Sequence, residues 1–441
     1  RISDDTFKDV LGFFEKYNFT IKEDMALDAE VAVDPQMLGY VYESLANVAE
    51  EIYDRNDLGI FYTPRVEVDF MCRRSLVEYL SQQLPEVPKE KVYQLVFDPS
   101  EDKERIEKYF SENKLWQKLE DTLDSLSAVD PACGSGAFLV GMLNVLAGIY
   151  RIVYKYRKVS LSDFQLKNRI VGRSLYGVDV MPWAIHAAEL RLWLQLIIET
   201  EFDKNALRKH PLLPNLNMNL RIGDSLVQEV GGINLHLRRA SISSELKKRL
   251  DSLKQEKQNY FNNAPTAKFK TKEQIVAEET RIFEDLINER IAFIESKIIE
   301  IKKAPKQMNL FGESAEEEET EKKYQATIER MHKERGELKG ALAKLDDPEK
   351  RPFVWDIDFA EIFGDKGGFD IVIGNPPYVR QEKISPPNRT KAEVTLEDRQ
   401  QYKEKLVNSV RAQFHVVKDI DRKGDYYIYF YFHALSLLNP K

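Results

Sequence analysis

Four short apolar runs in the chain each end in small or polar residues. They are SAVDPACGSG from Ser127, SLYGVDV from Ser174, NLRIGDSL from Asn219 and FDIVIGNPPY from Phe369. Longer stretches separate these runs, with apolar residues at the three-to-four spacing of helices. Strands that alternate with helices predict an α/β fold with a doubly wound, Rossmann-like parallel sheet. In such a sheet, ligands bind at the carboxyl ends of the strands.

The chain before the first run is predicted to be helical. Apolar residues recur at helical spacing up to about Leu58, as at Leu38, Val41, Leu45 and Val48. We expect Thr63 to be the N-cap of a further helix, which has Pro64 at its first position and extends through Leu80.

The most apolar stretch runs from Phe138 to Tyr154. It contains Gly141, Asn144 and Arg151, and it falls short of the length that a membrane span needs. It therefore predicts a buried core helix, and we expect no membrane association.

A long segment between Ser244 and Asp347 is rich in Lys and Glu and carries two series of apolar residues at heptad spacing. The series comprise Ile287, Ile291, Ile294, Ile298 and Ile301, then Ile328, Met331, Leu338, Leu342 and Leu345. Arg335 interrupts the second series, and the acidic run from Glu316 to Glu319 lies in the connection. This pattern predicts an inserted antiparallel helical hairpin, for which a spacer or docking arm is the simplest role.

A chain of 441 residues is expected to form more than one structural unit. We expect an N-terminal helical region over 1–115, a core over 116–243, the hairpin over 244–349 and a second part of the core over 350–441. Because the sequence opens at Arg1 and closes at Lys441, we also expect it to belong to a longer protein.

Composition narrows the class of protein. The chain has 43% hydrophobic and 31% charged residues, which is typical of a soluble protein. Its two cysteines, Cys72 and Cys133, form no CxxC pair or Cys/His cluster, so we expect a cytoplasmic location without disulfides or a metal site. The net charge of −8 argues against a uniformly basic surface but leaves room for a local positive groove.

The loop from Asp130 to Gly136 follows the first strand and opens a helix. Its glycines, Gly134 and Gly136, let a ligand approach the backbone closely. The loop lacks the full GxGxxG spacing, and Asp179 follows about fifty residues later rather than the roughly twenty of a dinucleotide fold. Hydride transfer is therefore disfavoured.

Two acids end the second and third strands. Asp179 is placed to accept hydrogen bonds from both hydroxyls of a ribose, and Asp224 ends its strand in the same way. Each acid has an equally ordinary alternative as the N-cap of a following helix.

The turn Gly374-Asn375-Pro376-Pro377-Tyr378 after the fourth strand is the most specific motif. The side-chain oxygen of Asn375 and the carbonyl of Pro376 offer two acceptors to one amine. The prolines fix the backbone, and Tyr378 supplies a face on which a planar base can stack. Two acceptors on a conjugated NH2 favour its nucleophilic form, whereas a plain turn has no need of this combination.

Taken in order, these motifs resemble those of the gamma-class N6-adenine DNA methyltransferases, especially the Eco57I-like and type IIG restriction-modification enzymes. FYTP from Phe61 resembles the family's upstream cofactor motif, and DPACGSGAFL its glycine loop. GVD from Gly177, GDSL from Gly223 and NPPY from Asn375 resemble the next three motifs, and DYYIYFYFHALSLLNP from Asp425 resembles the helix that follows them.

The resemblance implies S-adenosylmethionine as cofactor and double-stranded DNA as substrate. Phe61, Tyr62 and Thr63 would hold the methionine end of the cofactor, with Asp130, Ala132, Gly134 and Gly136 beneath it. Asp179 and Val180 would bind the ribose, and Asp224, Ser225 and Phe430 would contact the adenine ring. Asn375, Pro376, Pro377 and Tyr378 would grip a target base that has left the duplex.

The resemblance further implies restriction or defence partners, with a nuclease and a target recognition domain outside this sequence. No PD…(D/E)xK nuclease pattern is evident here. An RNA guanine or protein glutamine methyltransferase that uses the same NPPY motif remains an alternative, as does a non-catalytic cofactor- or DNA-binding subunit. A C5-cytosine mechanism is disfavoured because Cys133 lies in the cofactor loop.

The polar stretch from Arg380 to Asp425 contains four cations that could contact DNA phosphates, namely Arg380, Lys383, Arg389 and Lys391. Interleaved acids make a solvated loop the simpler prediction.

Overall fold

The computed structural model describes residues 8, 63–97, 103–197, 213–227, 229–230, 233–234, 243–303, 315–343, 345, 353–387, 393–414 and 424–440. The predicted helices before Leu58, together with Phe61, Tyr62, Arg389 and Lys391, lie outside these residues. The chain forms two compact units. Unit 1 comprises 1–220, 373–379 and 388–393, and unit 2 comprises 221–372, 380–387 and 394–441.

All four apolar runs form strands of one sheet. The strands are β1 (Ala128–Asp130), β2 (Leu175–Asp179), β3 (Leu220–Ile222) and β6 (Ile371–Val372), in the order β3-β2-β1-β6. β1 and β2 are parallel, with Asp130 opposite Gly177. A four-stranded parallel sheet among many helices confirms the mixed α/β class. β4 (Glu229–Val230) and β5 (Ile233–Asn234) form a separate antiparallel pair.

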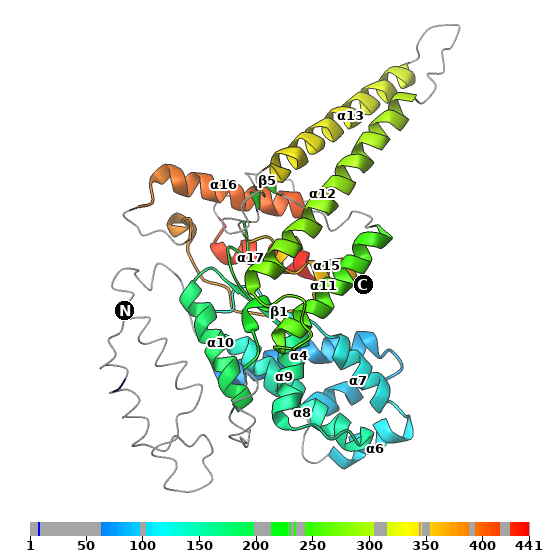
Figure 1. The fold of residues 1–441 in the computed structure, drawn as a ribbon, viewed down its shortest axis with the longest axis vertical. Coiled ribbons are helices and arrows are strands. Elements are labelled where there is room, and N and C mark those ends of the chain that lie inside the picture. The colour runs from blue at the N-terminus through cyan, green and yellow to red at the C-terminus, as the bar shows by residue number, and fades with distance from the viewer. Residues whose placement is uncertain are drawn as a thin grey trace. The chain divides into compact units, whose positions relative to one another are not determined.

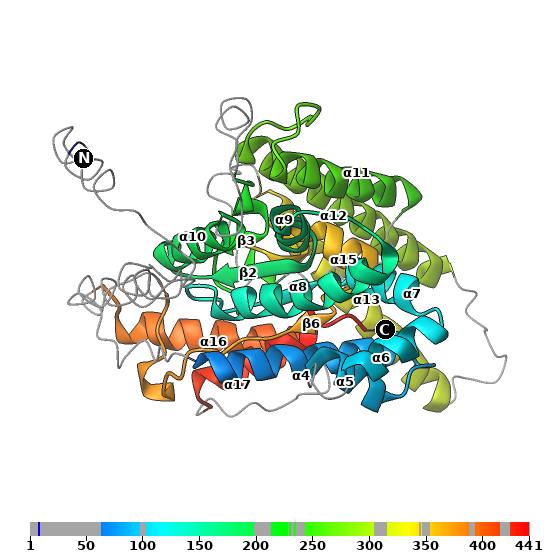
Figure 2. The same ribbon diagram turned by 90° about the horizontal axis from the view of Figure 1, so that it is seen from below.

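Helices of unit 1 surround a largely apolar central helix, α8 (Ala137–Arg157), which packs against β1 and β2 (Figure 2). Among the described residues it is the one helix that is long and apolar enough to cross a membrane, but 67% of its most apolar window is buried, as in a core helix. The predicted core helix over Phe138–Tyr154 is thus present. The others are α4 (Arg65–Gln83), α5 (Lys89–Phe97), α6 (Lys103–Glu112), α7 (Trp116–Ser125), α9 (Asp163–Ser174), α10 (Pro182–Ile197) and the 3₁₀ helix η1 (Leu216–Met218).

The start of α4 differs from the prediction by one residue. Pro64, rather than Thr63, is the N-cap, because its extended backbone (ψ 154°) precedes the helix while its carbonyl accepts a hydrogen bond from the Val68 N–H at 3.0 Å. No side chain caps the helix, and it continues past Leu80 to Gln83.

Unit 2 contains the segment that was predicted as a hairpin. Its helices are α11 (Ser244–Phe261), α12 (Lys272–Lys303), α13 (Ala315–Leu342), α14 (Trp355–Asp358), α15 (Ala360–Lys366), α16 (Leu396–Gln413), α17 (Tyr426–Leu437) and the 3₁₀ helix η2 (Gln381–Lys383). α12 and α13 form an extended hairpin (Figure 1). The range holds a third helix, α11, which the analysis of the sequence did not separate and which packs against α12.

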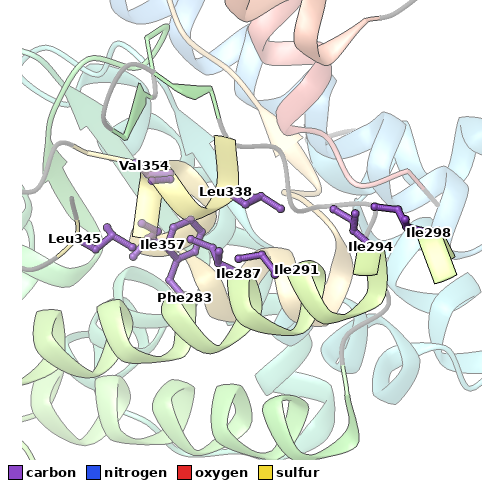
Figure 3. Close-up of a cluster of buried hydrophobic side chains, with 10 residues drawn as sticks. Phe283, Ile287, Ile291, Ile294, Ile298, Leu338, Leu345, Val354 and Ile357 are labelled. Atoms are coloured by element: carbon purple, nitrogen blue, oxygen red, sulfur yellow. The ribbon is translucent and has the colours of Figure 1, made fainter. Parts of the chain in front are cut away.

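A single apolar cluster joins this hairpin to the rest of unit 2 (Figure 3). Ile287 and Ile291 of α12 and Leu338 of α13 belong to it, together with Val354 and Ile357 around α14. The interrupting cation of the second series, Arg335, lies 3.5 Å from the Glu295 carboxylate of α12. The base of the hairpin is therefore packed into a core, which a free spacer arm would not need.

The polar stretch after NPPY is not wholly the solvated loop that was predicted. Residues Leu396–Gln413 form α16, whose N-terminus has a capping box in which Thr395 and Asp398 exchange hydrogen bonds. Tyr402, Leu406 and Val410 lie four residues apart and are buried on one face of the helix. Charged residues of the helix itself, such as Glu397, Glu404 and Lys405, are exposed, whereas Arg380 and Lys383 lie outside it.

Candidate functional site

Asp130 lies at the carboxyl end of β1 and is almost fully buried, with 1% of its surface exposed. Its Oδ1 accepts a hydrogen bond from the Ala132 N–H at 3.0 Å. Burial raises the pKa of the Asp130 carboxyl to about 8; this hydrogen bond opposes the shift, whereas the nearby charge of Asp179 adds to it. With no bound cation, Asp130 is therefore largely protonated at neutral pH.

The glycine loop depends on left-handed backbone at two positions. Gly134 has φ +51° and Gly136 has φ +81°, values that side-chain-bearing residues rarely adopt. A Cβ at Gly136 would come within 3.0 Å of the Ala188 Cβ, so this glycine also lets α10 pack closely. A Cβ at Gly134 would meet nothing within 4 Å. There is thus open space beside the Gly134 backbone.

Asp179, at the end of β2, is partly exposed and is held by backbone amides. Its Oδ2 accepts from the Gly134 N–H and its Oδ1 from the Met181 N–H, each at 2.9 Å. Burial raises the pKa of the Asp179 carboxyl, and hydrogen bonds from three backbone amides oppose that shift, the third from Val180. Through Gly134, the carboxylate also ties the glycine loop to the end of the second strand.

The NPPY turn lies beside Asp130. The Ile373 N–H donates to the Val129 carbonyl at 2.9 Å, which keeps the chain alongside β1 up to Gly374. A Cβ at Gly374 would lie only 2.4 Å from the Asp130 Oδ1, so a side chain at this position would collide with that carboxyl group. Asn375, Pro376 and Pro377 are partly exposed, and Tyr378 is 50% exposed. The turn is therefore accessible to a partner molecule.

In unit 2, Asp224 follows β3 and is held by three protein donors. Its Oδ1 accepts from the Leu226 N–H at 2.9 Å and the Val227 N–H at 3.1 Å, and its Oδ2 accepts from the Tyr402 hydroxyl at 2.7 Å. Burial raises the pKa of Asp224, and the bond from Tyr402 is the strongest opposing effect. Backbone amides thus bind Asp224, but the described residues that follow it, 225–227, form no helix, so it is not the helix N-cap that was the alternative prediction.

Phe430 lies in the same network of unit 2. The hydroxyls of Tyr402 and Tyr426 are 3.0 Å apart, and the Tyr426 and Phe430 rings meet edge to face at 5.4 Å. Burial raises the pKa of the Tyr402 phenol well above its ordinary value, so it donates to Asp224 at neutral pH. Ser225 is buried, and its carbonyl accepts from the Trp355 indole N–H at 3.0 Å.

Tyr402 is the residue of this site that the analysis of the sequence missed. The signal for it was present: a capping box at Thr395 followed by apolar residues four apart predicts a helix that buries Tyr402.

Neither cysteine is an activated nucleophile. Burial raises the pKa of the Cys133 thiol well above its ordinary value, and that of Cys72 to about 12. Within the described part of the chain, no three His, Cys, Asp or Glu side chains gather as metal ligands would.

Residues 173–441 match the Eco57I restriction-modification methylase family, which covers more than half of the sequence and three of the four strands above. The chain belongs to this family. Residues 106–229 also match the DNA-methyltransferase domain of MmeI. That range includes Asp130, the glycine loop and the ends of β2 and β3.

A related protein from Methanocaldococcus jannaschii is described as a putative type II restriction enzyme and methyltransferase. It is 28% identical to this chain over 397 residues. The match covers 84% of this chain but only 32% of the archaeal protein, so the chain spans about a third of that relative's length.

Proposed function

We propose that this chain transfers the methyl group of S-adenosylmethionine to the N6 amine of an adenine that has been flipped out of double-stranded DNA. The observation that carries the proposal is the accessible NPPY turn beside Asp130, at the carboxyl ends of the strands. Membership of the Eco57I methylase family supports the same reaction class.

The residues at the strand ends of unit 1 suit this cofactor. The open space at Gly134 allows a ligand to approach the backbone, and Asp179 lies at the end of β2, where a partly exposed carboxylate can accept hydrogen bonds from ribose hydroxyls. When bound, the cofactor supplies a methyl group on a cationic sulfonium. In unit 1 the holding residues would be Thr63, Asp130, Ala132, Gly134, Gly136, Asp179 and Val180. In unit 2, Asp224, Ser225 and Phe430 are the residues to which the resemblance gives contacts with the adenine ring.

A positive charge beside Asp130 would favour its ionised form and lower the raised pKa of its carboxyl. We infer that Asp130 ionises when the cofactor is bound and then attracts the cationic sulfonium electrostatically.

The NPPY turn provides the chemistry at the target base. The Asn375 side-chain oxygen and the Pro376 carbonyl would accept hydrogen bonds from the two amine N–H groups, which directs the nitrogen lone pair toward the methyl donor. Pro377 stiffens the turn, and the half-exposed ring of Tyr378 offers a stacking face. The bond from nitrogen to the methyl carbon would form as the bond from that carbon to sulfur breaks, and the methylated amine would then lose one proton to water. No strong base is needed before transfer, because the amine becomes acidic as it is alkylated, so orientation carries the catalysis.

The wider setting is also proposed. Restriction or defence partners, a nuclease and a target recognition domain would accompany this chain, as the much longer archaeal relative suggests. A cytoplasmic location fits a protein that acts on chromosomal or invading DNA.

The test is to identify the methylated product. The full-length protein is incubated with methyl-labelled S-adenosylmethionine and duplex DNA, RNA or total protein, and each product is digested and separated. We expect label in N6-methyl-2′-deoxyadenosine from DNA alone. Label in RNA or glutamine would favour the alternative methyltransferases, whereas cofactor binding without any transfer would favour a non-catalytic subunit.

A further inference from the structure

The turn that holds Asp224 is itself held by two buried side chains far away in the sequence. The Trp355 indole N–H donates to the Ser225 carbonyl at 3.0 Å, and the Ser409 hydroxyl donates to the Leu226 carbonyl at 2.7 Å. Trp355 is on α14 and is fully buried, and Ser409 is on α16 with 3% exposed. All of these residues belong to unit 2.

These two carbonyls share peptide planes with the two amides that bind Asp224. The Ser225 carbonyl and the Leu226 N–H belong to one planar peptide, and the Leu226 carbonyl and the Val227 N–H belong to the next. Because a peptide is rigid, a side chain that fixes the direction of its carbonyl also fixes the direction of its N–H. Both amides point at the Asp224 Oδ1, at 2.9 and 3.1 Å.

The residue before Asp224, Gly223, is also held in place by packing. A Cβ at Gly223 would lie 2.1 Å from the Phe353 Cβ, so Phe353 presses directly on the backbone just before the acid. Phe353 and Trp355 are edge to face at 5.0 Å. The segment that returns from the hairpin thus contacts both sequence neighbours of Asp224.

An ionic cluster anchors that returning segment to β3. The Arg221 guanidinium, three residues before Asp224, bonds the Glu279 carboxylate of α12 at 2.6 Å and the Asp358 carbonyl of α14 at 3.2 Å. Lys257 of α11 bonds the same Glu279 at 2.7 Å. All four side chains are buried, so the base of the inserted helices is fixed relative to the strand that leads to Asp224.

We propose that Trp355 and Ser409 are positioning residues for Asp224: by orienting the Leu226 and Val227 amides, they hold its carboxylate ready for the adenine amine of the cofactor. The role of Asp224 toward the cofactor rests on the proposed function. The orientation of the two amides rests only on the hydrogen bonds described above. The inserted helices α11 and α12 anchor α14 through the ionic cluster, and α14 in turn supplies Trp355 to the turn that holds Asp224.

Two variants test the two peptides one at a time. Trp355→Phe removes the donor to the Ser225 carbonyl and should speed hydrogen exchange at the Leu226 amide. Ser409→Ala removes the donor to the Leu226 carbonyl and should speed exchange at the Val227 amide. Trp193→Phe is the matched control, since its indole donates to the Pro214 carbonyl, also at 3.0 Å, but in unit 1. Exchange is read residue by residue by mass spectrometry with electron-transfer fragmentation.

The same proteins are titrated with S-adenosylmethionine. Each of the two variants should bind it about fivefold more weakly, as expected for one lost hydrogen bond, with kcat at saturation unchanged and the Trp193→Phe affinity unchanged. Unaltered exchange at both amides, or equal weakening in the control, would overturn the positioning role. If the unmodified protein fails to bind the cofactor, the proposed function fails instead, while the exchange data still decide whether the two side chains orient the amides.

Discussion

The ends of β2 and β3 each present an aspartate, and the two are held in different ways. Asp179 is bound by backbone amides of nearby turns, from Gly134, Met181 and Val180. Asp224 is bound by two backbone amides and, on its second oxygen, by the hydroxyl of Tyr402, 178 residues away. The comparison teaches that similar strand-end acids differ in whether a helix far away in the sequence supplies one of their hydrogen-bond donors.

Removal of each acid should show this difference most strongly. Asp179→Ala should weaken S-adenosylmethionine affinity about 100-fold, because two charge-assisted hydrogen bonds to a ribose would be lost. Asp224→Ala should weaken it only about tenfold, since this carboxylate would accept a single hydrogen bond, from the adenine amine, while the Tyr402 hydroxyl binds its second oxygen. Calorimetric titration measures both, and equal losses or the reverse order would contradict the comparison.

The hydroxyl of Tyr402 is the next feature to test. Tyr402→Phe leaves the Asp224 Oδ2 without this donor, so the free energy of unfolding should fall by about 1–2 kcal/mol and the pKa of Asp224 should rise further. Urea titration measures the stability. Tyr426→Phe is the control, because it removes the neighbouring hydroxyl but keeps the bond from Tyr402 to Asp224; a loss as large as that of Tyr402→Phe would speak against a special role for Tyr402.

An effect that depends on pH is expected from Asp130, whose pKa is raised by burial to about 8. Between about pH 4 and pH 8 the folded protein holds a proton that the unfolded chain has lost, so stability falls as the pH rises through this window. In Asp130→Asn, the free energy of unfolding should fall less steeply with pH, by up to about 1.4 kcal/mol per pH unit. Urea titrations from pH 5 to pH 8 check this, and parallel curves for variant and unmodified protein would show that Asp130 is already ionised.

The parts of this molecule that the sequence predicted are those whose signals are local. β1, β2, β3 and β6 follow from short apolar runs, and α8 follows from a long one. The cofactor loop could be placed because its glycines and Asp130 lie within seven residues of one another. Left-handed backbone at Gly134 and Gly136 then follows from the sharp change from strand to helix.

The supports of Asp224 could not be predicted in the same way. Trp355 reaches Ser225 across 130 residues, and no periodicity links the two. The cluster of Arg221, Glu279 and Lys257 joins three elements whose charged residues resemble a solvated helix face when the sequence is read alone. Mixed charge also hid α16, although its capping box and buried series were visible in the sequence.

The central claim is that the NPPY turn performs methyl transfer, and Asn375→Ala tests it most directly. The variant should bind S-adenosylmethionine as the unmodified protein does but methylate DNA at least about 100-fold more slowly, as when a key polar stabiliser is deleted. Asn113→Ala is the control, since its amide donates to the Tyr109 carbonyl on an exposed part of α6. Undiminished methylation by the Asn375 variant would contradict the account.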